Sequence, residues 1–256
     1  MRIVITALLL APAAALASSA FDGTWKLQPD SMKVTGKPDV YIIADGMYTC
    51  SSCVPEVKVK ADGSDQNVAG HAYYDTLAAK VLSPSSVQIV QKKAGKTLTD
   101  VTYTVSADGK TLTGKVIDTT GAKPASITFK ETRVAAGPAG AHAISGSWLG
   151  GVTEADSTAG IVNYTMSADG FSMKWNGQSY DAKFDGKEYP VVGDPGHTRV
   201  KLQKIDDNTV EETDYRMGRV TDQIHLAAAK DGKTLDVTDK DVEHGQTTTY
   251  TLAKQP

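Results

Sequence analysis

The feature that most constrains the fold is an internal repeat, because the second half of the chain matches the first at an offset of 123 positions. The phrase DGKTL occurs at 108–112 and again at 231–235. Gly23-Thr-Trp25 aligns in the same way with Gly146-Ser-Trp148. One offset shared along the whole unit indicates duplication of a structural unit.

The two copies are separated by VAAGPAGAHA at 134–143, a small-residue segment with Pro and Gly that is typical of a linker. We therefore predict one domain over 21–133 and a second over 144–256.

The preceding residues, 1–20, have the pattern of a signal peptide: one positive charge, a short apolar run and then small residues. They predict a periplasmic or secreted protein. No later segment approaches the ~20 apolar residues of a membrane span.

Each copy has the pattern of a β meander. Asp-Gly pairs, the strongest short hairpin signal, recur throughout both halves, and the residues between them alternate between apolar and polar. Short strands with one apolar face must close or stack to protect their edges. The predicted fold class is all-β, with two tandem antiparallel up-and-down meander barrels of roughly eight or nine strands each.

The only two cysteines, Cys50 and Cys53, lie in the segment YTCSSCVPEV. The second copy has SMKWNGQSYD at 172–181 in the same place, where Asn176 and Gly177 predict a two-residue turn that pairs Trp175 with Gln178. We therefore expect Cys50 and Cys53 to face each other across a hairpin tip.

An exported hairpin favours a disulfide between these cysteines, because the compartment is oxidising. Two alternatives stay open at this stage. A redox-active dithiol would need a helix N-terminus in a βαβ setting, and a zinc site would need two more ligands. Neither context is evident in the sequence.

Composition argues against several classes of function. The chain has 27 basic and 30 acidic residues, a formal charge of −3 and no basic cluster, which makes nucleic acid a poor candidate partner. No serine-nucleophile elbow, phosphate loop or other cofactor motif occurs. We predict no cofactor, no metal site and no enzymatic activity.

Three groups of ionisable residues are candidate sites. The histidines lack metal-pair spacing and are interpreted as surface or loop residues: His71, His142, His197, His225 and His244. Glu211 and Glu212 point to opposite faces of a strand, so this adjacent pair cannot act together. The acidic segment 236–244 lacks a calcium-loop pattern and is interpreted as a solvated edge strand and turn.

Bulky side chains gather in the second copy. Inward-facing bulky residues usually fill a core, but in a barrel that keeps a cavity they would meet an apolar ligand. The candidate lining residues are Tyr164, Met166, Phe171, Met173, Trp175, Tyr180, Phe184, Ile224 and Leu226.

The Gly-x-Trp motif on the first strand of each copy, together with the meander, resembles the lipocalin (calycin) signature. The resemblance implies that Trp25 and Trp148 pack at the closed base of each barrel. It also implies that Arg133 lies against Trp25, whereas the second copy, which ends LAKQP, has no such arginine.

Nearly all of the chain after the signal peptide resembles an uncharacterised family of exported bacterial proteins with tandem lipocalin-like β domains. The phrases YTCSSC, VSADGKTLT and KIDDNTVEETD carry this likeness, which implies no activity. The function we expect is a secreted or periplasmic, non-enzymatic binding protein that holds a small apolar ligand in a barrel interior. The alternative is a structural or protein-interaction module with an envelope protein as partner; an enzyme is the least favoured class.

Overall fold

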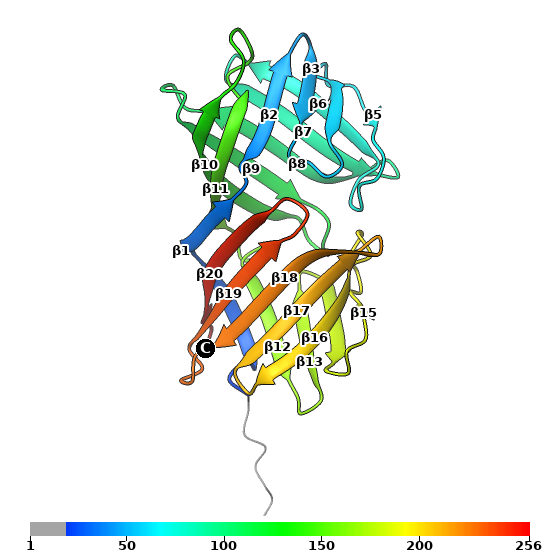
Figure 1. The fold of residues 1–256 in the computed structure, drawn as a ribbon, viewed down its shortest axis with the longest axis vertical. Helices are drawn as coiled ribbons and strands as arrows, with labels where there is room; N and C mark the ends of the chain where they lie inside the picture. Colours follow the sequence, from blue (N-terminus) through cyan, green and yellow to red (C-terminus); the bar gives the residue numbers. More distant parts are fainter. Residues whose placement is uncertain (1–18) are drawn as a thin grey trace, which may run out of the picture.

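The computed structural model describes residues 19–256, so the predicted signal peptide lies almost entirely outside the described residues. Between these residues the chain forms twenty β-strands and no helix. The strands make two ten-stranded antiparallel sheets (Figure 1). The predicted all-β fold with two barrel-like sheets is confirmed. The strand number is slightly higher than expected because each sheet includes a two-residue strand, β5 or β15.

We call the sheet built mainly from the first repeat barrel 1. Its strands, in spatial order, are β4 (Val57–Lys60), β3 (Met47–Cys50), β2 (Asp39–Ala44), β11 (Gly146–Ala155), β10 (Ala125–Ala136), β9 (Thr111–Asp118), β8 (Lys96–Val105), β7 (Ser86–Lys93), β6 (Thr76–Ser83) and β5 (Gln66–Asn67).

Barrel 2 is the sheet built mainly from the second repeat. Its strands, in spatial order, are β14 (Gln178–Lys183), β13 (Gly170–Trp175), β12 (Ile161–Met166), β1 (Gly23–Gly36), β20 (Gln246–Lys254), β19 (Thr234–Asp241), β18 (Arg219–Ala228), β17 (Thr209–Arg216), β16 (Arg199–Asp206) and β15 (Tyr189–Pro190).

The ends of each sheet approach each other, so each sheet is nearly closed. In barrel 2 the backbones of Ser179 and Val192 exchange two hydrogen bonds of 3.0 and 2.7 Å, which connect β14 to the segment after β15. In barrel 1 the Gly63 amide donates to the Ala79 carbonyl of β6 at 2.8 Å. These bonds satisfy backbone groups that an open edge would leave unpaired.

The first strands of the two repeats are exchanged. β1 lies between β20 and β12 in barrel 2, and β11 lies between β10 and β2 in barrel 1, as Figure 1 shows for the blue β1 beside the red β20. β10 continues to Ala136, into the predicted linker, and the chain then turns back so that β11 pairs directly with β10. Neither 21–133 nor 144–256 therefore forms a barrel by itself.

The exchange also corrects the expected packing at the barrel bases. Trp25 and Trp148 are both fully buried. Arg133 does not lie against Trp25; its guanidinium carbon is 3.9 Å from the ring centroid of Trp148, because β11 rather than β1 is the neighbour of β10. Over Trp25 the corresponding cation is Lys254, at 5.4 Å. The guanidinium of Arg133 also donates to three carbonyl oxygens, those of Gly109, Ala143 and Ser145.

The two hairpins compared at the sequence level differ at their tips. Asn176 and Gly177 form the predicted turn with φ of 42° and 83°, and Trp175 pairs with Gln178. The Cys50–Cys53 disulfide is present, with a Cα–Cα distance of 5.4 Å. Cys50, however, pairs with Val57 rather than with Cys53, so the tip is a longer loop over 51–56. The expected two-residue turn was wrong because Ser-Ser lacks the positive-φ preference of Asn-Gly.

Candidate ligand cavity

A cavity of about 790 Å³ lies inside barrel 2 and reaches the adjoining end of barrel 1. Most of its wall consists of inward-facing side chains from β1, β12–β14 and β17–β20. Barrel 1 contributes residues of β2, β10 and β11. The volume falls within the range of about 300–1,000 Å³ that is usual for small-molecule sites.

Six of the nine predicted lining residues do line this cavity: Tyr164, Met173, Trp175, Tyr180, Ile224 and Leu226. The other three do not. Phe171 is fully buried, and its ring contacts those of Phe21 and Tyr164 with centroid distances of 5.2 Å. Met166 and Phe184 pack against the same core. One part of barrel 2 is therefore a filled core and the other part is hollow.

Aromatic rings of barrel 1 pack against one another beside the cavity. The ring of Tyr103 lies between Tyr41 and Phe129, with centroid distances of 5.5 and 5.8 Å. Tyr41 and Phe129 themselves line the cavity, and small residues also form its wall: Gly150 and Gly151 of β11, with Ala159 and Gly160 before β12. The small residues leave space beside the rings.

Five carboxylic acids line the cavity: Asp39, Glu131, Glu212, Asp214 and Asp239. Glu212 and Asp214 follow Val210 at alternate positions of β17, and Val210 is fully buried. Because alternate residues of a strand share a face, all three side chains point inward. The Glu212 and Asp214 residues are 8% and 9% exposed.

These acids have few hydrogen-bond donors around them. Tyr180 Oη donates to Glu212 Oε2 at 2.6 Å. Among residues 19–256, Asp214 Oδ1, Asp239 Oδ1 and Glu131 Oε2 are buried without a hydrogen-bond partner. Buried acceptors are normally satisfied, so each of these oxygens calls for an explanation.

Burial also changes the ionisation of these acids. It raises the pKa of Glu131 to about 8 and that of Asp239 to about 7, and nearby carboxylates add to both shifts. The pKa values of Glu212 and Asp214 are raised for the same first reason, the loss of hydration on burial. Around neutral pH, a neighbouring charged group can therefore shift these carboxyl groups between the protonated and the ionised form.

Arg216 is the cation of this region, but its guanidinium is already engaged. Nη2 contacts Asp222 Oδ2 at 2.8 Å, and Nε donates to Thr198 Oγ1 at 3.0 Å. The guanidinium carbon also lies 5.4 Å from the ring centroid of Tyr73 of barrel 1. Arg216 consequently donates no hydrogen bond to the unpartnered oxygen of Asp214.

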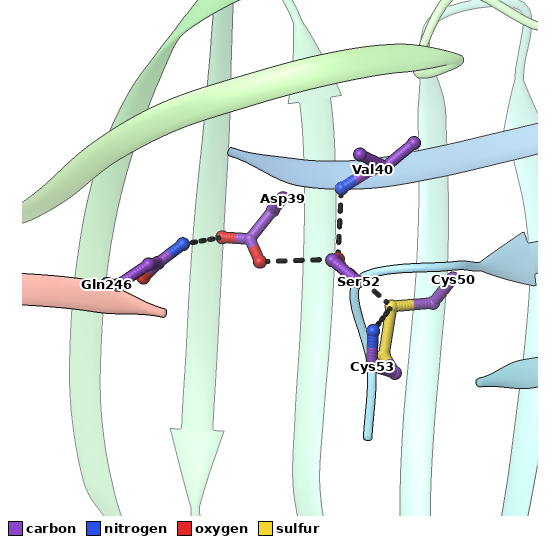
Figure 2. Close-up of a disulfide and its surroundings, with 6 residues drawn as sticks. All are labelled: Asp39, Val40, Cys50, Ser52, Cys53 and Gln246. Carbon is purple, nitrogen blue, oxygen red and sulfur yellow. Dashed lines mark hydrogen bonds between the residues drawn. A yellow bond between two sulfur atoms is a disulfide. The ribbon is translucent and has the colours of Figure 1, made fainter. Parts of the chain in front are cut away.

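Asp39 connects the cavity to the disulfide loop (Figure 2). Gln246 Nε2 donates to Asp39 Oδ2 at 3.3 Å, and Ser52 Oγ donates to Asp39 Oδ1 at 3.4 Å. Ser52 Oγ also accepts the Val40 amide at 3.0 Å. Because Ser52 lies between Cys50 and Cys53, the disulfide holds the segment that positions Asp39.

The sequence analysis did not predict that five acids line one cavity, and we call these residues the acidic wall: Asp39, Glu131, Glu212, Asp214 and Asp239. The prediction that Glu211 and Glu212 point to opposite faces is confirmed, since Glu211 Oε1 contacts His225 Nδ1 on the outer face at 2.7 Å and Glu212 is buried. The informative spacing was Glu212 to Asp214. Asp239 was assigned to a solvated edge strand, which is wrong because β19 lies between β18 and β20. Asp39 and Glu131 carried no signal, because their place depends on how the two barrels meet.

The part of the chain from 19 to 256 contains no group of three or more His, Cys, Asp or Glu side chains that could hold a metal ion. Within the same residues no helix is long and apolar enough to span a membrane. The chain matches no protein-family model, and no curated protein and no solved structure matches it either.

Proposed function

We propose that this protein is a secreted or periplasmic binding protein that holds a small molecule with a largely apolar body inside barrel 2. The observation that carries the proposal is the cavity of about 790 Å³, which is lined by aromatic, Met and aliphatic side chains. Such a lining favours apolar ligands because burying their surface gains roughly 25 cal/mol per Å².

A binding role without catalysis agrees with the composition of the wall. The inward carboxylates lie next to tyrosines and apolar groups, and no nucleophile, base and orienting group can be named together. Export, as the first 20 residues predict, would place the binding site in the periplasm or the medium.

A neutral fluorescent probe, N-phenyl-1-naphthylamine, tests the proposal. We expect its emission to rise on titration with the protein and to saturate at one probe per chain. Thr248→Trp places a large side chain in the cavity and should weaken binding at least about tenfold. The matched control is Thr249→Trp, on the outward face of the same strand β20, which should bind as the wild type does. Equal binding by both variants, or no binding by the wild type, would overturn the proposal.

A further inference from the structure

We propose that the ligand carries a protonated amine, which binds among Glu212, Asp214 and Asp239 while its apolar body occupies the rest of the cavity. This inference rests on the proposed function and names the class of ligand. Its basis is the surplus of buried acceptors over donors at this end of the cavity.

Among residues 19–256, buried acceptors without partners gather at this end of the cavity. Asp214 is nine-tenths buried, lines the cavity and has an oxygen without a partner among the described residues. Asp239, from β19, presents a second such oxygen in the same cavity. Glu212 uses one oxygen to accept from Tyr180 at 2.6 Å. A ligand with several N–H donors would satisfy these groups, and an ammonium has three.

Ionisation of the acids gives this end of the cavity a negative charge. Barrel 2 brings four carboxylates together here, from Glu212, Asp214, Asp222 and Asp239, and each is close enough to raise the pKa of another. The local cation, Arg216, is paired with Asp222 at 2.8 Å. When these groups are ionised, an anionic ligand would add to their mutual repulsion, whereas a cation would relieve it. A charge-assisted hydrogen bond is also roughly twice as strong as a neutral one.

The cavity favours an organic cation over a metal ion as the occupant. Over 19–256 no three His, Cys, Asp or Glu side chains are grouped so that they could hold one. The apolar remainder of the wall, which includes Leu226, Val237 and Leu252, would also be without purpose for a bare ion. An amine on an apolar body uses both parts of the cavity.

Binding should be linked to pH, since the acids must ionise to pair with the amine. The titratable and charged groups around this end are Tyr164 (β12), Tyr180 (β14), Glu212, Asp214 and Arg216 (β17), Asp222 (β18), Asp239 and Asp241 (β19), Tyr250 (β20), Asp39 (β2) and Glu131 (β10). The tyrosines stay neutral, because burial raises their pKa values. The carboxyl groups therefore govern the response, and amine affinity should rise between pH 6 and pH 8.5.

Calorimetric titration with octylamine, octanol and octanoate tests the inference, because the three share one chain and differ in charge. At pH 8 we expect octylamine to bind at least about tenfold more tightly than octanol, and octanoate to bind least. Asp214→Asn and Asp239→Asn should each weaken octylamine at least about tenfold and leave octanol within about twofold. The control Glu211→Gln, on the outward face of β17, should change neither.

The outcomes separate this inference from the function on which it rests. If the neutral fluorophore and octanol bind but octylamine binds no better than octanol, the amine is overturned and the binding function stands. Unchanged octylamine affinity in both Asp variants would overturn the assigned position. If the wild type binds none of the three compounds and no fluorophore, both proposals fail.

Discussion

The buried carboxyl group of Asp214 is expected to make the free energy of folding less favourable. Its carboxyl group is buried, one oxygen has no partner among residues 19–256, and its neighbours Glu212 and Asp222 are also acidic. Burying an unpaired polar group is unfavourable, and groups of this kind are often retained because a ligand uses them. Asp214 is thus expected to reduce stability in the absence of ligand.

The contribution of Asp214 to stability depends on pH. Burial raises the folded-state pKa of Asp214 above the unfolded value of about 3.9, so its contribution to stability is fully present below pH 4 and is lost as pH rises toward the folded pKa. Asp214→Asn should therefore leave stability nearly unchanged at pH 4.5 and increase it by on the order of 1–3 kcal/mol at pH 8. Urea unfolding at the two pH values measures the difference.

Asp181→Asn is the matched control for this measurement, since Asp181 is an exposed acid on the outward face of β14. It should show no such change between the two pH values. A variant Asp214→Asn that is less stable than the wild type at pH 8 would mean that the carboxylate is satisfied in the folded protein.

Among the elements, β1 and β11 show how local sequence can leave topology undetermined. Both begin with Gly-x-Trp, and each could fill the first-strand position of either barrel. In the exchanged fold β11 pairs with β10 directly after the connection 137–145, and β1 packs across β11. At Gly151 a Cβ atom would lie 2.8 Å from the sulfur of Met32, so glycine permits this close crossing.

Cross-linking distinguishes the exchanged from the unexchanged topology. In the exchanged fold Thr24 pairs with Asn163, and in an unexchanged fold it would take the place of Ser147 opposite Val40. Directly opposite residues are within reach of a disulfide. Oxidation of Thr24→Cys with Asn163→Cys should give an intramolecular cross-link, seen by peptide mapping of the monomer. A cross-link in Thr24→Cys with Val40→Cys instead would contradict the exchange.

Local patterns predicted some elements well for a physical reason. Alternation along a strand fixes which side chains share a face, and Asn-Gly favours a two-residue turn, so the Asn176-Gly177 turn and the pairing of Trp175 with Gln178 followed directly from sequence. The disulfide was predicted from compartment, but its loop was not, because the register beyond Cys50 depends on Val57 across the strand pair. The acidic wall could not be predicted from sequence, because Asp39 and Glu212 belong to different barrels and line one cavity only where the barrels meet.

Over the whole molecule, the two barrels are joined into one unit. The chain passes between them after β1 and again after β11. Their surfaces also meet, since Asn176 Nδ2 donates to the Lys123 carbonyl at 2.8 Å and Lys93 Nζ donates to the Pro195 carbonyl at 2.8 Å. The cavity is lined from both sides of this junction. Ligand binding should therefore depend on the intact pair of barrels.

Native mass spectrometry of the protein purified from the organism that makes it addresses the binding function most directly. We expect the folded chain to carry an extra small mass that is released on unfolding, and we expect Thr248→Trp, produced in the same host, to lack it because its cavity is filled. The Thr249→Trp protein should retain the mass. A bare chain in all three cases, or a co-purified protein in place of a small molecule, would contradict a ligand-binding role for the cavity.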